Sequence, residues 1–160
     1  MKIVFAGGRN VGLIGLLTAK ATGHHIVFVM PSDKLMEDFA NRLDLLTFFL
    51  DKTRPHADLF VSVHCRTTIP QWYLDYFPKG GINVHPCLWK YKGADPVGRL
   101  LSDGETKASV GIHRMTEKVD KGEVLWEEFV DVTGCKTREE VYNKLYPLYA
   151  VGLVEVLRTL

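Results

Sequence analysis

An asparagine and a histidine stand two positions apart at the end of an apolar run, in the segment INVHPCLW. On an extended strand, residues two apart point to the same side. At the carboxyl end of a parallel strand, that side faces the crevice in which α/β proteins bind ligands. The amide of Asn83 and the imidazole of His85 could stabilise the oxyanion of an attacked carbonyl there and handle its proton. A structural role stays open for both, with His85 ending the strand and Asn83 satisfying the turn backbone.

Asp120 lies in the segment TEKVDKG, which connects two late strand-like segments. An acidic residue shortly before a glycine is ordinarily part of a turn. The connection could also bring the carboxylate against the imidazole of His85, where it would orient the ring and favour its protonated form. The residues alone therefore lead to a candidate set of Asn83, His85 and Asp120 for carbonyl chemistry.

A glycine-rich turn, FAGGRNVG, links the first apolar run to a helical pattern. Such a turn presents backbone N–H groups and the positive end of a helix to an anion. Its spacing differs from the dinucleotide-binding GxGxxG pattern, and it lacks the Lys-Ser/Thr of a P-loop. Asp33 lies roughly where a ribose-binding acid would stand, which leaves a dinucleotide site open. A tight turn that needs glycine for close packing is an equally good interpretation.

Histidine and cysteine occur in two close pairs, His64-Cys65 and His85-x-Cys87. Both pairs stand at expected strand ends and could approach each other. Structural zinc sites usually space paired ligands by roughly two to four residues. Because these pairs are adjacent or one residue apart, we expect no metal.

The elements that position these residues follow an alternating order. Four short apolar runs are typical of buried parallel strands, at residues 2–6, 26–30, 59–64 and 82–85. Helical patterns lie between and after them, at residues 11–22, 32–50, 72–77 and 95–103. In the second helix Ser32 is the expected N-cap, and the apolar stripe consists of Leu35, Phe39, Leu43, Leu46 and Leu50.

The pattern changes after residue 104. Residues 109–115 and 124–132 alternate like strands without a long helix between them, which predicts an antiparallel pair at the sheet edge. A capping box at residues 137–140 starts a last helix, expected to kink near Pro147, with its stripe at Val141, Leu145, Leu148, Val151 and Val154. We therefore predict an α/β, Rossmann-like fold with a mostly parallel sheet, helices on both faces and an antiparallel edge pair, in a single domain over residues 1–160.

The composition is that of an ordinary globular chain. With 160 residues, 46% of them hydrophobic, the chain can bury a core of its own. Its 20 basic and 19 acidic residues give a net charge of +1 and no electrostatic reason to expect a nucleic acid partner. Three cysteines without a CxxC fit a reducing compartment, and no apolar run is long enough for a membrane span or signal segment. We expect a cytoplasmic protein with no membrane partner, and the sequence is compatible with a homodimer.

Three segments taken together resemble the folate-dependent formyltransferase family. They are Asn83-Val-His-Pro-Cys-Leu88, Lys92-Gly93 and Val119-Asp-Lys-Gly122, and they follow each other in the family's order. A joint match across residues 83–132 is far more specific than any single segment. The resemblance implies the formyltransferase fold and the transfer of a formyl group from 10-formyltetrahydrofolate to the amino group of a small acceptor.

The resemblance also implies a role for each matched residue. Asn83 would hydrogen-bond the formyl oxygen as it becomes an oxyanion, and His85, protonated or strongly polarised, would share that stabilisation and relay a proton. Asp120 would orient His85 and, through water, help to remove the proton from the attacking nitrogen. A more loosely matched segment would line the pterin pocket with backbone groups, and it consists of Cys65, Arg66, Thr67, Thr68 and Ile69. A phosphate of the acceptor could lie at the glycine turn, on Gly7, Gly8, Arg9 and Asn10.

Two segments depart from the family pattern. Cys87-Leu88-Trp89 is one residue shorter than the family's usual Ser-Leu-Leu-Pro and lacks the proline, so we expect Trp89 to reshape one wall of the site. The region between Met30 and Leu59 is also short for the family, and the resemblance implies that this region contributes to acceptor and folate specificity.

The acceptor stays open between a phosphorylated ribosyl amine and a nucleotide-linked amino sugar. A transfer RNA is disfavoured by the near-neutral charge and by the lack of a C-terminal barrel. Three other functions compete with transfer. They are a hydrolase that releases formate from 10-formyltetrahydrofolate, a catalytically inactive module that binds folate or a nucleotide, and an NAD-dependent dehydrogenase.

Overall fold

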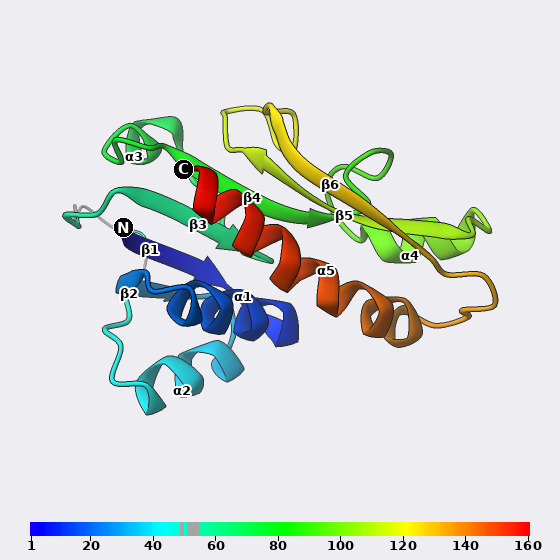
Figure 1. Ribbon diagram of the computed structural model, residues 1–160, viewed down its shortest axis with the longest axis horizontal. Helices are drawn as coiled ribbons and strands as arrows, with labels where there is room; N and C mark the ends of the chain where they lie inside the picture. The colour runs from blue at the N-terminus through cyan, green and yellow to red at the C-terminus, as the bar shows by residue number, and fades with distance from the viewer. Residues whose placement is uncertain (49, 51–54) are drawn as a thin grey trace.

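The computed structural model describes residues 1–48, 50 and 55–160, which form one six-stranded sheet with five helices (Figure 1). The strand order is β2-β1-β3-β4-β5-β6. The strands are β1 (Lys2–Gly7), β2 (His25–Pro31), β3 (Leu59–Val63), β4 (Gly81–Pro86), β5 (Lys107–Arg114) and β6 (Val124–Asp131). The helices are α1 (Arg9–Ala21), α2 (Lys34–Arg42), α3 (Gln71–Leu74), α4 (Pro96–Ser102) and α5 (Arg138–Thr159).

Strands β1 to β4 run parallel, and β5 and β6 complete the sheet as an antiparallel pair. This arrangement confirms the predicted mostly parallel sheet with an antiparallel edge pair. Parallel neighbours need long crossover connections, whereas the antiparallel pair needs only a loop. The register between β4 and β5 places His113 opposite Asn83 and Gly111 opposite His85.

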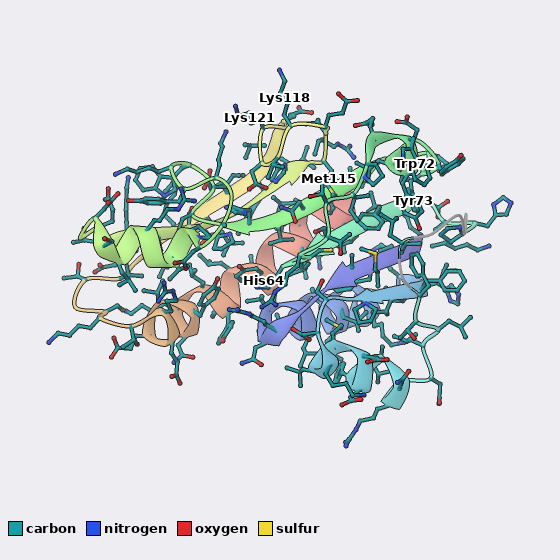
Figure 2. All side chains as sticks on the ribbon, turned by 180° about the vertical axis from the view of Figure 1, so that it is seen from behind. His64, Trp72, Tyr73, Met115, Lys118 and Lys121 are labelled. Atoms are coloured by element: carbon teal, nitrogen blue, oxygen red, sulfur yellow. The ribbon has the colours of Figure 1, made fainter. Side chains whose placement is uncertain are left out.

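The two faces of the sheet are covered unequally. Ile3 and Phe5 of β1 belong to the larger core, to which α1, α2, α4 and α5 contribute, whereas Val4 and Ala6 belong to a smaller core under α3. Helices thus lie on both faces, as predicted, but among the described residues the second face carries only the four-residue α3. We call this second face, which carries Val4 and Ala6, the open face; Figure 2 shows the molecule from that side.

Helix α2 begins one residue later than the sequence pattern predicts. Its N-cap is Asp33, whose Oδ1 accepts the N–H of Met36 at 2.9 Å, rather than Ser32. Aspartate and serine are comparable N-caps, and Asp33 gains a second partner in the N–H of Arg9 at 2.7 Å. One carboxylate therefore serves the beginnings of both α1 and α2.

Helix α2 also ends much earlier than predicted. It stops at Arg42, which leaves part of the predicted stripe outside the helix, namely Leu43, Leu46 and Leu50. The free edge of β2 accounts for this, because Val29 donates its N–H to the Leu46 carbonyl at 2.9 Å and accepts the N–H of Phe48 at 3.0 Å. Backbone pairing with the edge strand overrides the helical pattern. Residues 49 and 51–54 of the predicted stretch and its connection lie outside the described residues.

Helix α5 has the predicted beginning. The Thr137 hydroxyl accepts the N–H of Glu140 at 3.2 Å, and the Glu140 carboxylate accepts the N–H of Thr137 at 3.1 Å, which confirms the capping box. The helix runs on through Pro147, but its buried stripe then follows Tyr149, Gly152, Leu153, Val156 and Leu157. Of the predicted stripe beyond Pro147, Leu148 packs against the larger core, whereas Val154 is half-buried and the prediction is wrong for the exposed Val151. No helix of the described chain has the length and apolar character needed to cross a bilayer.

Candidate active site

Asn83 and His85 lie on the open face of the sheet. Ile82 and Val84, which alternate with them along β4, belong to the larger core on the opposite face. A cavity of about 770 Å³ covers this part of the open face and extends to Arg9 at the carboxyl edge of the sheet. Both predicted catalytic side chains line this cavity.

Asp120 reaches the same cavity from the loop between β5 and β6. The loop approaches the strand closely, because a Cβ at Gly122 would lie 1.8 Å from the carbonyl oxygen of Arg114. Asp120 itself has a left-handed backbone with φ of 52°, which aspartate tolerates better than most residues. The loop thereby turns the Asp120 side chain toward Asn83 and His85, so the three predicted catalytic residues lie together.

The Asp120 carboxylate has four close partners. Its Oδ1 lies 3.2 Å from Asn83 Nδ2 and 3.2 Å from His113 Nε2. Its Oδ2 accepts the backbone N–H of Gly93 at 2.8 Å and lies 3.4 Å from His85 Nδ1. Burial raises the pKa of Asp120, but the contacts with His113, His85 and Gly93 outweigh burial and lower the pKa to about 2. The side chain is therefore a fixed anion at neutral pH.

His85 has an acceptor at each ring nitrogen. Its Nε2 lies 2.8 Å from the Tyr91 carbonyl, which can only accept, so Nε2 carries a hydrogen. Its Nδ1 faces Asp120, as the sequence predicts. Burial lowers the pKa of the imidazolium, and it outweighs the Asp120 carboxylate and the Tyr91 carbonyl, which raise the pKa. The expectation that Asp120 favours the protonated ring thus has the right sign, but burial has the larger effect.

His113 is a site residue that sequence reasoning missed. It is almost fully buried, donates through Nδ1 to the Arg114 carbonyl at 2.7 Å, and places Nε2 3.2 Å from both Asp120 Oδ1 and Asn83 Nδ2. A proton on Nε2 donates to Asp120, whereas the bare nitrogen accepts from Asn83. The available signal was a histidine in the middle of the apolar strand 109–115, but only the register with β4 places it beside Asn83.

The segment predicted to line the pterin pocket borders the same cavity. It follows β3, the neighbour of β4 on the side away from β5, so it flanks Asn83 opposite the Asp120 loop. The N–H of Arg66 donates to the Ser32 hydroxyl at 3.3 Å, which ties the segment to the end of β2. All five predicted residues line the cavity, namely Cys65, Arg66, Thr67, Thr68 and Ile69. Their binding of a pterin stays a prediction.

The carboxylate of Asp33 hydrogen-bonds the backbone of the glycine turn. Asp33 accepts the N–H of Arg9 through Oδ2 and caps α2 through Oδ1, so a ribose would have to compete for both oxygens. A Cβ at Gly7 would lie 2.7 Å from the Val63 carbonyl oxygen, which supports the tight-turn interpretation. Of the four predicted phosphate-binding residues, Arg9 lines the described cavity and Gly7, Gly8 and Asn10 do not. Phosphate binding at this turn stays a prediction.

The short loop after His85 turns away from the cavity. Trp89 packs against Phe129 with ring centroids 5.9 Å apart, and its backbone N–H donates to Glu127 at 2.9 Å. Trp89 is not among the residues that line the cavity, so the expectation that it reshapes a wall of the site is wrong. The loop acts on the site indirectly, by carrying the Tyr91 carbonyl to His85.

The two histidine–cysteine pairs do not converge. Cys87 is buried in the larger core, on the face opposite His85, and burial raises the pKa of its thiol to about 11. Within residues 1–48, 50 and 55–160, no three His, Cys, Asp or Glu side chains come close enough to hold a metal ion.

Known proteins with similar sequences and folds are formyltransferases. Residues 18–157 match the family model described as Formyl transferase. The chain is 30% identical over 163 residues to the methionyl-tRNA formyltransferase of Rickettsia massiliae, covering 98% of this chain and 51% of that protein. Its structure is similar to glycinamide ribonucleotide transformylase 1 from Symbiobacterium toebii, with a TM-score of 0.84, 19% identity, and coverage of 99% and 86% of the two chains. It is also similar to WlaRD, a sugar 3N-formyl transferase whose structure was determined in the presence of dTDP and 5-N-formyl-THF (TM-score 0.82, 21% identity, coverage of 99% and 62%).

The matches cover most of this chain but only part of the length of the methionyl-tRNA formyltransferases. The chain spans 36% and 51% of the length of two methionyl-tRNA formyltransferases that it matches. The structural similarity confirms the predicted formyltransferase fold. Because the family model covers most of the sequence, from residue 18 to residue 157, the chain belongs to the formyl transferase family.

Proposed function

We propose that the chain transfers a formyl group from 10-formyltetrahydrofolate to the amino group of a small acceptor. The observation that carries this proposal is the set of contacts around Asp120, which hold Asn83, His85 and His113 within 3.4 Å of one carboxylate. An amide-like formyl group is a poor electrophile, so stabilising its tetrahedral intermediate is the main way to accelerate attack. A buried cluster of donors around a fixed anion on a sheet face supplies that stabilisation.

Asn83 and His85 would share the developing negative charge. The amide nitrogen of Asn83 carries two N–H bonds, of which one can be shared by Asp120 and His113, and the other is left for the formyl oxygen. A protonated His85 would have the Tyr91 carbonyl as acceptor at Nε2 and the Asp120 carboxylate 3.4 Å from Nδ1. Asp120 would thus act by orienting His85 and balancing its charge.

The residues that line the cavity support separate places for the formyl donor and the acceptor. The segment Cys65–Ile69 and the loop that carries Asp120 flank the catalytic residues on the open face, where the folate would lie. At the carboxyl edge the lining residues are Arg9, Tyr142 and the ion pair of Arg138 with Asp95. We place the acceptor at this edge, with Arg9 as the cation for a phosphate.

The names of relatives indicate which acceptors to test. The structural neighbours act on a glycinamide ribonucleotide and on an amino sugar, and both kinds of molecule are small. The Rickettsia massiliae relative is named for a transfer RNA, but the charge of +1 here offers little attraction to a polyanion. We therefore propose a phosphorylated ribosyl amine or a nucleotide-linked amino sugar as acceptor, and no nucleic acid partner.

The test is a transfer assay with 10-formyltetrahydrofolate and a panel of amines that includes glycinamide ribonucleotide and dTDP-linked and GDP-linked amino sugars. Tetrahydrofolate is followed by absorbance, the formylated amine by mass spectrometry, and formate by an enzymatic assay. We expect tetrahydrofolate only in the presence of an amine, with a loss of about 100-fold or more in kcat for Asn83→Ala. The matched control is Asn41→Ala on the exposed side of α2, which should keep full activity. Formate release without any amine would instead identify a hydrolase, and folate binding without turnover an inactive module.

A further inference from the structure

His64 stands at the carboxyl edge of the sheet, between the glycine turn and the catalytic residues. It follows β3 directly, and the residue before it, Val63, pairs with Gly7 of β1 on one side and Val84 of β4 on the other. His64 is the first residue after β3, at the edge of the sheet where β1 and β4 also end. Figure 2 shows it beyond the end of β3, near the beginning of α1. None of the roles described above uses this side chain.

The imidazole of His64 is available to a ligand. It is half-buried and lines the cavity together with Arg9 and His85. Among the described residues it has no hydrogen-bond or ion-pair partner. Its backbone is left-handed, with φ of 57°, a conformation that few non-glycine residues adopt, although histidine adopts it more readily than most.

Several residues that line this cavity have a left-handed backbone conformation. Six non-glycine residues of the described chain have positive φ, and four of them line the cavity, namely Arg9, His64, Asp95 and Asp120. Backbone conformations of this kind cost energy and gather at functional sites. Asp120 and Arg9 have roles in the proposed site, and His64 faces the same cavity.

The proposed reaction needs a proton acceptor that the predicted catalytic residues do not provide. An amine that attacks a formyl carbon must lose a proton. Asp120 has four close partners and a pKa of about 2, so it is a very weak base, directly or through water. Both ring nitrogens of His85 and of His113 face groups of the protein. Glu117 also lines the cavity, but its side chain is exposed in the part of the loop that precedes Asp120.

We propose that His64 accepts the proton that the acceptor amine loses, as a further catalytic residue of the proposed transfer. The nitrogen lone pair forms a bond to the formyl carbon, the carbonyl π electrons move onto the oxygen, and one N–H proton passes to the free ring nitrogen of His64. When the intermediate collapses, the bond between the formyl carbon and N10 of the folate breaks. N10 leaves with a proton that His64 returns through water, so the ring is neutral again after each turnover.

The charges around His64 suit this role. Burial lowers the pKa of His64, and Arg9, Arg66 and His85 lower it further, whereas Asp33 raises it. The net direction is downward from 6.5, so the ring is neutral at neutral pH and can accept a proton. Arg9 also lies where it would hold an anionic acceptor beside this base.

The experiment compares wild type with His64→Asn and His64→Gly, two residues that tolerate the left-handed backbone. We expect kcat with the best amine of the panel to fall about 100-fold in both variants, with the KM for 10-formyltetrahydrofolate changed less than about threefold. The acidic limb of the kcat/KM profile against pH should disappear, and added imidazole should restore part of the rate of His64→Gly. The matched control is His25→Asn, an exposed histidine at the opposite end of the sheet, which should behave as wild type.

A second measurement needs no acceptor. The His64 ring signal, assigned by its loss in His64→Asn, is titrated by proton NMR, and a midpoint below 6.5 is expected. A midpoint above about 7 would overturn the proposal, because the ring would then be protonated before the amine arrives. Wild-type turnover together with full activity and an unchanged pH profile in His64→Asn would overturn this proposal alone. Absence of transfer by wild type to every amine would instead overturn the proposed function on which it rests.

Discussion

The charge of Asp120 should make a measurable and pH-dependent contribution to stability. Its pKa of about 2 in the folded protein lies below the ordinary value of 3.8. A folded pKa below the unfolded one stabilises the protein at pH values above the unfolded pKa, and this stability is lost as pH falls toward the folded pKa. With about 1.4 kcal/mol for each pH unit, the full contribution at neutral pH is about 2 kcal/mol. About half of it is lost between pH 5 and pH 3.

The assay is urea unfolding of wild type and Asp120→Asn at pH 5 and pH 3. Wild type should lose about 1 kcal/mol more of its free energy of unfolding over this interval than the variant. Because the same pH interval is compared in both proteins, any destabilisation by the new amide cancels if it does not depend on pH. Asp38→Asn, an exposed change on α2, serves as control and should follow wild type. Equal losses in wild type and Asp120→Asn would refute the contacts that we assign to the carboxylate.

Three further substitutions test a buried hydroxyl, the loop that carries Asp120 and the beginning of α5. Tyr149→Phe should leave stability unchanged or raise it by about 1 kcal/mol in thermal unfolding, because the buried hydroxyl has no hydrogen-bond partner in the described chain; a clear loss would reveal one. Gly122→Ala should reduce kcat by about 100-fold, since its Cβ would collide with the Arg114 carbonyl and displace Asp120, and wild-type kinetics would show that the loop gives way freely. Thr137→Ala should lower the free energy of unfolding by about 1 kcal/mol in urea, and no change would mean that the capping box is not needed to start α5.

The sequence predicted the catalytic strand because its pattern is local. Asn83 and His85 alternate with Ile82 and Val84, so a period of two places the polar pair on one face whatever the neighbouring strands do. The same holds for the capping box at Thr137, whose two hydrogen bonds span three residues. These elements needed no knowledge of the rest of the fold.

The features that sequence reasoning missed depend on pairing between distant segments. His113 joins the site only because β5 pairs with β4 in one particular register, and a shift by one residue would turn it into the larger core. The early end of α2 depends on the edge of β2, where Val29 binds Leu46 and Phe48. Asp33 likewise seemed available for a ligand until the structure placed it against Arg9. In each case a hydrogen-bond partner far along the chain decided the outcome.

The reversal of direction between β4 and β5 explains why the site is on the open face. The antiparallel β5 sets His113 directly beside Asn83 and continues into a loop that returns over the same face. Asp120 follows His113 by only seven residues, so the carboxylate is tied to both strands that carry its partners. The groups that would polarise the formyl group thus lie on or next to the antiparallel edge, where strands hold them rigidly. His64 and Arg9 come instead from the segments that directly follow the parallel strands β3 and β1, which is why we place proton removal and acceptor binding there.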